Sequence, residues 1–165
     1  FTTLSETMTP QENFDFVNAY LREVSPKIRE HHGFIVKYLG DGMMAVFPNS
    51  ADDAVQAGIA KLQQVHQYNI KRQKSGYQAI QVGVGINFGR MMVGMVGEPE
   101  RMQGDAFSDQ VNVAARLESL TRFYGVSLVI SENTLAHLSH PEQYQLRFLD
   151  KVIVKGRQEP ISIFE

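Results

Sequence analysis

An Asp-Gly turn between two apolar segments is the strongest constraint on the fold of this chain. Residues 33–38 and 43–47 are rich in apolar residues, and Leu39-Gly40-Asp41-Gly42 lies between them. Asp-Gly flanked by apolar runs is a strong hairpin signal, because these residues accept the backbone angles of tight turns. The sequence therefore predicts an antiparallel strand pair with Asp41 exposed at its tip.

Helical patterns flank this predicted hairpin on both sides. Thr9-Pro10-Gln11-Glu12 has the composition of a helix start, with a capping threonine, a proline at the first helical position and a glutamate that can complete a capping box. Apolar residues follow at helical spacing, and Pro26 is expected to kink or restart the helix. A second helix is predicted from Ser50 to about Arg72, and the polar stretch at 69–79 is expected to be a loop within the domain.

The second half of the chain predicts further strands and one more long helix. A second hairpin is expected from residues 80–87 and 91–96, with Phe88-Gly89-Arg90 as its turn, and a polar arm follows at 98–104. The remaining expected elements are a helix at 111–123 capped by Gly125, a strand at 126–130, a short helix at 131–137, and a strand pair at 147–154 and 161–164. This order predicts the α+β class, with helices packed on a mostly antiparallel sheet.

Composition and charge narrow the range of functions. The 165 residues, 43% of them hydrophobic, suffice for one globular domain with a core. A net charge of −2 does not favour nucleic-acid binding, which usually needs a strongly basic face. The lack of cysteine excludes disulfides and cysteine chemistry, and no apolar run reaches the roughly 20 residues that span a bilayer. We therefore expect a cytoplasmic domain with no nucleic-acid partner and no direct membrane contact.

Several motifs, in order along the chain, resemble one enzyme family. The hairpin segment with Lys37 and the Leu-Gly-Asp-Gly turn resembles that of the class III adenylate and guanylate cyclases, as do residues 85–89 and 93–97. The most specific match is Asp-Gln-Val-Asn-Val-Ala-Ala-Arg-Leu-Glu at 109–118. Each motif alone is weak, but together they cover nearly the whole chain. The resemblance implies the class III cyclase fold, an α+β structure with a ferredoxin-like βαββαβ core.

The resemblance assigns a metal site and a phosphate site to the start of the chain. Asp41 matches one of two aspartates that together hold two divalent cations, Mg²⁺ or Mn²⁺, per site. The other aspartate would precede Phe1, so residues 1–165 are expected to be a single catalytic domain whose first strand is truncated. Phe1 and Thr2 match a turn whose backbone N–H groups cradle the terminal phosphates. Taken alone, Asp-Gly is simply favourable turn chemistry.

Two positions match those that read the base of the nucleotide. Lys37 and Asp105 correspond to the pair that recognises adenine, whereas guanylate cyclases usually carry glutamate and cysteine there. A charged pair in a pocket discriminates because the wrong base leaves polar groups without partners. The resemblance therefore implies ATP as the substrate. Outside this context, a lysine on a strand usually belongs to a solvated face.

The family resemblance also assigns catalytic and phosphate-binding side chains. Asn112 and Arg116 lie four residues apart, on one helix face; the asparagine would orient the ribose and the arginine would stabilise charge on the transferring phosphate. Lys155 matches a lysine that reaches the polyphosphate, and Arg101 matches an arginine in an arm of variable length. Without the motif, Asn112 and Arg116 would be read as ordinary surface residues.

Family active sites form between two catalytic domains, and this chain carries the residues of both halves. The expected assembly is therefore a homodimer that converts ATP to cyclic AMP and pyrophosphate, controlled by an upstream regulatory domain in the parent protein. The alternatives are a guanylate cyclase, or a non-catalytic cyclase-homology domain that dimerises or senses nucleotide. A diguanylate cyclase or polymerase palm would need a Gly-Gly-Asp/Glu-Glu-Phe hairpin, which residues 39–43 are not.

Overall fold

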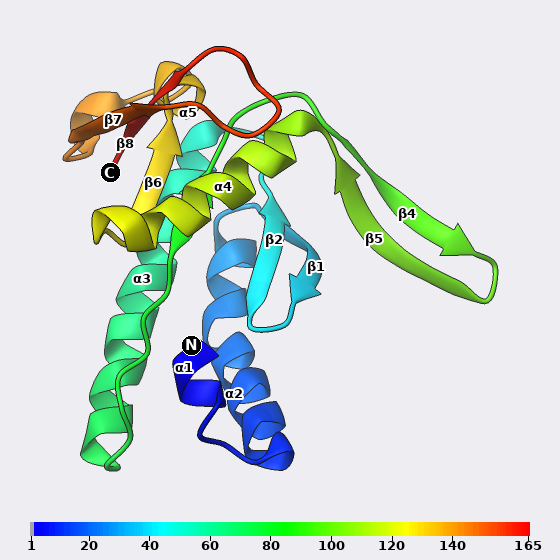
Figure 1. Ribbon diagram of the computed structural model, residues 1–165, viewed down its shortest axis with the longest axis vertical. Helices are drawn as coiled ribbons and strands as arrows, with labels where there is room; N and C mark the ends of the chain where they lie inside the picture. The colour runs from blue at the N-terminus through cyan, green and yellow to red at the C-terminus, as the bar shows by residue number, and fades with distance from the viewer. Residues whose placement is uncertain (1) are drawn as a thin grey trace.

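The computed structural model describes residues 2–165, and three long helices form its framework (Figure 1). The long helices are α2 (Pro10–Glu30), α3 (Ala51–Lys74) and α4 (Asp109–Tyr124), and the short ones are α1 (Thr2–Ser5), α5 (Glu132–Ala136) and a 3₁₀ turn at Pro141–Gln143. The predicted capping box of α2 is confirmed. The Thr9 hydroxyl accepts from the backbone N–H of Glu12, and the Glu12 carboxylate accepts from that of Thr9.

The strands form three separate hydrogen-bonded sheets. The pair β1 (Phe34–Leu39) and β2 (Gly42–Val46) is antiparallel, as is the pair β4 (Met92–Glu98) and β5 (Arg101–Phe107). The third sheet has the order β3-β6-β8-β7, made of β3 (Val84–Ile86), β6 (Leu128–Ser131), β8 (Ile161–Phe164) and β7 (Phe148–Val152). Its strands are antiparallel except for the β3–β6 pair, which is parallel. The α+β class, the first hairpin and the last strand pair are thus confirmed.

The predicted second hairpin is wrong. Strand β3 pairs in parallel with β6, with Val84 opposite Leu128, and β4 pairs instead with β5. The expected polar arm at 98–104 is therefore the tip and second strand of a long two-stranded ribbon, which projects away from the helices in Figure 1. Alternation of apolar residues marks a strand but not its partner, and a parallel partner lies far away along the chain.

Two helix predictions also need correction. Helix α2 runs without interruption through Pro26, so the proline does not restart it. Buried Val24 and Ile28 on either side hold this part of α2 in the core, and such packing outweighs the local cost of a proline. Helix α3 continues to Lys74, so the first part of the expected loop at 69–79 is helical.

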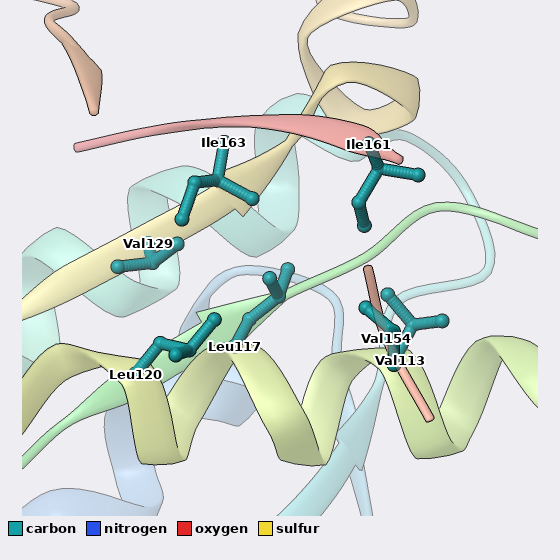
Figure 2. Packing of buried hydrophobic residues seen from close by; sticks show 7 residues of the cluster. All are labelled: Val113, Leu117, Leu120, Val129, Val154, Ile161 and Ile163. Atoms are coloured by element: carbon teal, nitrogen blue, oxygen red, sulfur yellow. The ribbon is translucent and has the colours of Figure 1, made fainter. Parts of the chain in front are cut away.

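Helix α4 is fixed on one face of the four-stranded sheet by an apolar core. Figure 2 shows Val113, Leu117 and Leu120 of α4 facing Val129 of β6 and the two buried isoleucines of β8. Each fully buried side chain of this kind contributes about 1.5–3 kcal/mol. At Gly85 of β3 an added Cβ would overlap the backbone of α4, so only glycine permits this close approach. The position of α4 relative to the sheet is therefore tightly defined.

The opposite face of the same sheet is covered by the first half of α3. Ile130 follows Val129 in β6 and points the other way, as alternate residues of a strand do, and it packs against Ala51 and Val55 of α3. A separate apolar cluster joins α2 to α3 through Tyr20, Val24 and Val65 and also takes in Met43 of the hairpin. The helices thus connect the hairpin to the sheet.

Candidate functional site

Lys37 and Asp105 meet across two strands that belong to different sheets. The Lys37 ammonium on β1 donates to Asp105 Oδ1 on β5 at 2.9 Å, and both side chains are largely covered, at 27% and 21% exposed. The backbone N–H of Ala106 donates to the same carboxylate oxygen at 2.8 Å. The hydrogen bond from Lys37, followed by that from Ala106, lowers the pKa of Asp105 below its ordinary value. The structure therefore brings Lys37 and Asp105 together as an ion pair in which Asp105 is held by a second hydrogen bond.

Strand β5 leads directly into the first turn of α4, where Asn112 lies. Ser108 caps this helix by accepting from the backbone N–H of Gln110 at 3.0 Å. A cavity of about 480 Å³ opens at the junction and is lined by Ala106, Phe107, Ser108, Asp109, Val111 and Asn112. Asn112 and Arg116 are exposed, one helical turn apart, as four-residue spacing requires. Asn112 thus lines a cavity on the chain segment that directly follows Asp105.

Asp41 lies in the turn of the β1–β2 hairpin, as the sequence predicts, but its side chain is half-buried and not exposed as expected. Figure 1 shows this turn at the end of the hairpin away from the start of α4. The Asp41 charge adds to the effect of burial in raising the pKa of Tyr20 on α2. None of the hydrogen bonds or ion pairs described in residues 2–165 joins Asp41 to Asn112, Arg116 or Lys155.

Lys61 is a charged residue near Asp41 that the sequence analysis missed. It lies on α3, and burial lowers the pKa of its ammonium, while the charges of Glu118 and Asp41 oppose this shift. The sequence does carry a signal for this inward position. Lys61 is four residues from both Ala57 and Val65, which are buried, so it falls on the apolar stripe of the helix.

The remaining predicted residues are placed apart from these groups. Arg101 is exposed at the start of β5, at the tip of the long ribbon, and Lys155 is exposed in the segment between β7 and β8. Thr2 is the first residue of α1, and Phe1 lies outside the described residues. The structure thus brings together Lys37, Asp105 and the start of α4, and leaves the phosphate-binding candidates dispersed.

The described residues offer one carboxylate of the expected metal site. Between residues 2 and 165, no three histidine or acidic side chains gather closely enough to hold a metal ion. Carboxylate oxygens are what Mg²⁺ and Mn²⁺ prefer, so Asp41 fits as one ligand and cannot by itself form a two-metal site. No helix in this part of the chain has the length and apolar character to cross a membrane.

Comparison with known proteins adds independent evidence on the family. The family model described as the adenylate and guanylate cyclase catalytic domain matches residues 1–164. An adenylate cyclase of Anabaena cylindrica is 42% identical over 171 residues, a match that covers 100% of this chain and 34% of that protein. The chain thus spans about a third of the length of this relative.

Solved structures with the same fold include cyclases of both substrate types. The adenylyl cyclase CyaB from P. aeruginosa is 28% identical, with a TM-score of 0.84 over 99% of this chain and 86% of that one. The guanylyl cyclase Cya2 is 27% identical, with a TM-score of 0.79 over 99% of this chain and 84% of that one. Overall similarity therefore does not distinguish ATP from GTP as the substrate. This distinction depends on the residues of the site.

Proposed function

The chain belongs to the adenylate and guanylate cyclase catalytic domain family, and from this we propose that it converts ATP to 3′,5′-cyclic AMP and pyrophosphate. The observation that favours ATP over GTP as the substrate is the ion pair between Lys37 and Asp105, at 2.9 Å. It supplies a fixed donor and a fixed acceptor on adjacent strands, which suits the ring nitrogen and the exocyclic amine of adenine. Guanine would present an acceptor and a donor in the reverse arrangement, leaving both groups without partners.

The reaction is an intramolecular phosphoryl transfer. The 3′ oxygen of the ribose attacks the α-phosphorus, the bond from that phosphorus to the bridging oxygen breaks, and pyrophosphate leaves with that oxygen. The 3′ hydroxyl proton passes to water, and no covalent intermediate with the protein forms. The tasks of the protein are therefore to position the substrate and to stabilise charge.

Helix α4 supplies the side chains closest to the reacting atoms in this proposal. Asn112, which lines the cavity at the start of α4, orients the ribose so that its 3′ oxygen faces the α-phosphorus. Arg116, one turn further on, donates to the phosphate oxygens as their charge grows. A guanidinium suits this role because it is always charged and can donate two parallel hydrogen bonds.

The triphosphate and the metal ions are held by groups outside α4. Lys155 and Arg101 provide positive charge for the phosphates, and the backbone at Phe1 and Thr2 provides N–H donors. Asp41 would hold Mg²⁺ or Mn²⁺ as one carboxylate ligand. Divalent ions, when bound, activate the attacking oxygen and stabilise the leaving one.

The proposed active unit is a homodimer of this single domain. One chain carries Asp41 on one side and the group formed by Lys37, Asp105, Asn112 and Arg116 on another, so two chains related by a twofold axis complete two sites. The ribbon of β4 and β5 supports this assembly because its large apolar side chains are exposed, which is rare in monomers. The exposed side chains are those of Met92, Val93, Met95, Val96, Met102 and Phe107. We expect regulation by other domains of the same polypeptide, in a cytoplasmic setting.

A direct assay tests this function. The full-length protein is incubated with Mn²⁺ and either ATP or GTP, and cyclic AMP and cyclic GMP are quantified alongside an Asn112→Ala variant. We expect cyclic AMP from ATP, falling at least about 100-fold in the variant. Cyclic GMP as the main product would favour a guanylate cyclase. No product from a folded, dimeric sample would favour the non-catalytic alternative.

A further inference from the structure

The side chain of Asn87 ties the first turn of α4 to the sheet. Asn87 directly follows β3, and its Nδ2 donates to the backbone carbonyl of Gln110 at 3.0 Å and to the Gln110 side-chain oxygen at 2.8 Å. Gln110 belongs to the first turn of α4, two residues before Asn112. One amide group therefore holds the part of the helix from which Asn112 projects.

The other end of the Asn87 amide is anchored in the core. Its Oδ1 accepts from the Ser131 hydroxyl at 2.6 Å, and Ser131 is 1% exposed at the end of β6. The neighbouring Thr134 is fully buried and donates to the carbonyl of Ile86 at 3.2 Å. Because buried hydrogen-bonded groups of this kind are costly to disrupt, Asn87 has a fixed orientation.

The loop after Asn87 contacts the same helix end at two further points. The Ser108 hydroxyl donates to the carbonyl of Arg90 at 2.6 Å while accepting from the N–H of Gln110 at 3.0 Å. At Gly89, an added Cβ would overlap the Gln110 side chain, so the loop lies directly against it. Residues 87–90 thus hold the helix start, and Asn87 provides the link to the buried core.

We propose that Asn87 is a positioning residue for the cyclisation reaction, acting through α4 on Asn112 and Arg116. This inference rests on the proposed function. Asn87 itself is bonded to protein groups on both sides, so it orients the helix and does not contact the substrate. A helix is stiff over one or two turns, so a shift at Gln110 moves both side chains. A displacement of about 1 Å costs on the order of 100-fold in rate.

The substitution Asn87→Asp tests the amide with almost no change in shape. The carboxylate still accepts from Ser131 but cannot donate to Gln110, and it then faces two carbonyl-type oxygens. A matched control exists on α3, where Asn69 Nδ2 donates to the Ile80 carbonyl at 2.9 Å and its Oδ1 accepts from the Ile80 N–H at 2.7 Å. Asn69→Asp removes the same kind of donor from a different part of the fold.

The experiment compares both variants with the full-length wild-type protein by enzyme kinetics and amide hydrogen exchange. For Asn87→Asp we expect kcat to fall about 10- to 100-fold with KM for ATP changed much less, and exchange at residues 110–112 to speed up about tenfold. Asn69→Asp should leave kcat and the exchange at residues 110–112 unchanged. Equal kcat losses in the two variants, or unaltered exchange at 110–112, would overturn the proposal. If the wild type makes no cyclic AMP, the proposed function fails, and the exchange data still decide whether Asn87 holds α4.

Discussion

At the scale of single residues, Lys61 shows how a charge placed on a buried helix face affects its surroundings. Burial lowers the pKa of its ammonium, and the opposing charges of Glu118 and Asp41 offset only part of this cost. Burying a charged group without a close partner is unfavourable, and exchange for a hydrophobic residue of similar size is often stabilising. Lys61 therefore lowers the stability of the fold near neutral pH.

We expect Lys61→Met to raise the free energy of unfolding by about 1 kcal/mol at pH 7. Because the folded-state pKa of Lys61 lies below its ordinary value of 10.5, the folded protein releases this proton first. The wild type should therefore gain stability as pH rises toward about 10, and the variant should lack this gain. Urea unfolding at pH 7 and at about pH 10 measures the free energy of unfolding of the wild type and the variant. The control is Lys74→Met, because Lys74 lies on the same helix and is exposed. Parallel pH profiles for the wild type and Lys61→Met would contradict the argument.

The sequence associated Lys37 with Asp105 but did not indicate the packing that brings them together. Lys37 and Asp105 were paired by their resemblance to base-reading positions, and the structure joins them at 2.9 Å. Their proximity depends on β5 passing beside β1, a contact between distant segments that no local pattern encodes. Asn87 lies within a recognised motif, but its bond to Gln110 depends on how β3 and α4 pack. Such roles emerge only from tertiary structure.

At the scale of elements, the Asp-Gly turn and the helix caps were reliable local signals, whereas Pro26 and the turn at 88–90 were misleading and pairings between distant segments were not indicated. The β1–β2 hairpin followed from one Asp-Gly turn, whose signal is contained in a few residues. The β3–β6 pair joins Val84 to Leu128 in parallel, and the intervening segment gives no sign of it. Helix caps are also local signals. The predicted Gly125 cap of α4 has the expected left-handed backbone, with φ of 66°.

The left-handed backbone at Gly125 leads us to predict how substitutions there change the free energy of unfolding. An alanine at Gly125 would meet no atom within 4 Å, so its only penalty is the left-handed backbone. We expect Gly125→Ala to lower the free energy of unfolding by about 1 kcal/mol. Gly125→Asn should lose less, because asparagine tolerates this conformation. Urea titration of the three proteins measures the series, and equal stability of wild type and Gly125→Ala would show that the cap is not strained.

At the scale of the whole molecule, none of the hydrogen bonds or ion pairs described for residues 2–165 joins Asp41 to Asp105, Asn112 or Arg116. Asp41 is at the hairpin tip, and the Lys37–Asp105 pair continues toward Asn112 on α4. The exposed apolar ribbon of β4 and β5 lies next to the Lys37–Asp105 pair, since β5 carries Asp105. A monomer would therefore hold two half-sites, and a twofold dimer would hold two complete ones.

Coexpression of two inactive variants tests this arrangement. Asp41→Ala and Asn112→Ala should each be inactive alone, because each removes one half of every site. A mixed dimer combines the intact Asp41 of one chain with the intact Asn112 of the other, so equal expression should restore about one quarter of the wild-type activity. Cyclic AMP production per mole of dimer measures the recovery. In the matched control, Asp41→Ala is coexpressed with a chain carrying both substitutions, and no complete site can form. A purified mixed dimer that stays inactive would show that Asp41 and Asn112 do not act in one shared site.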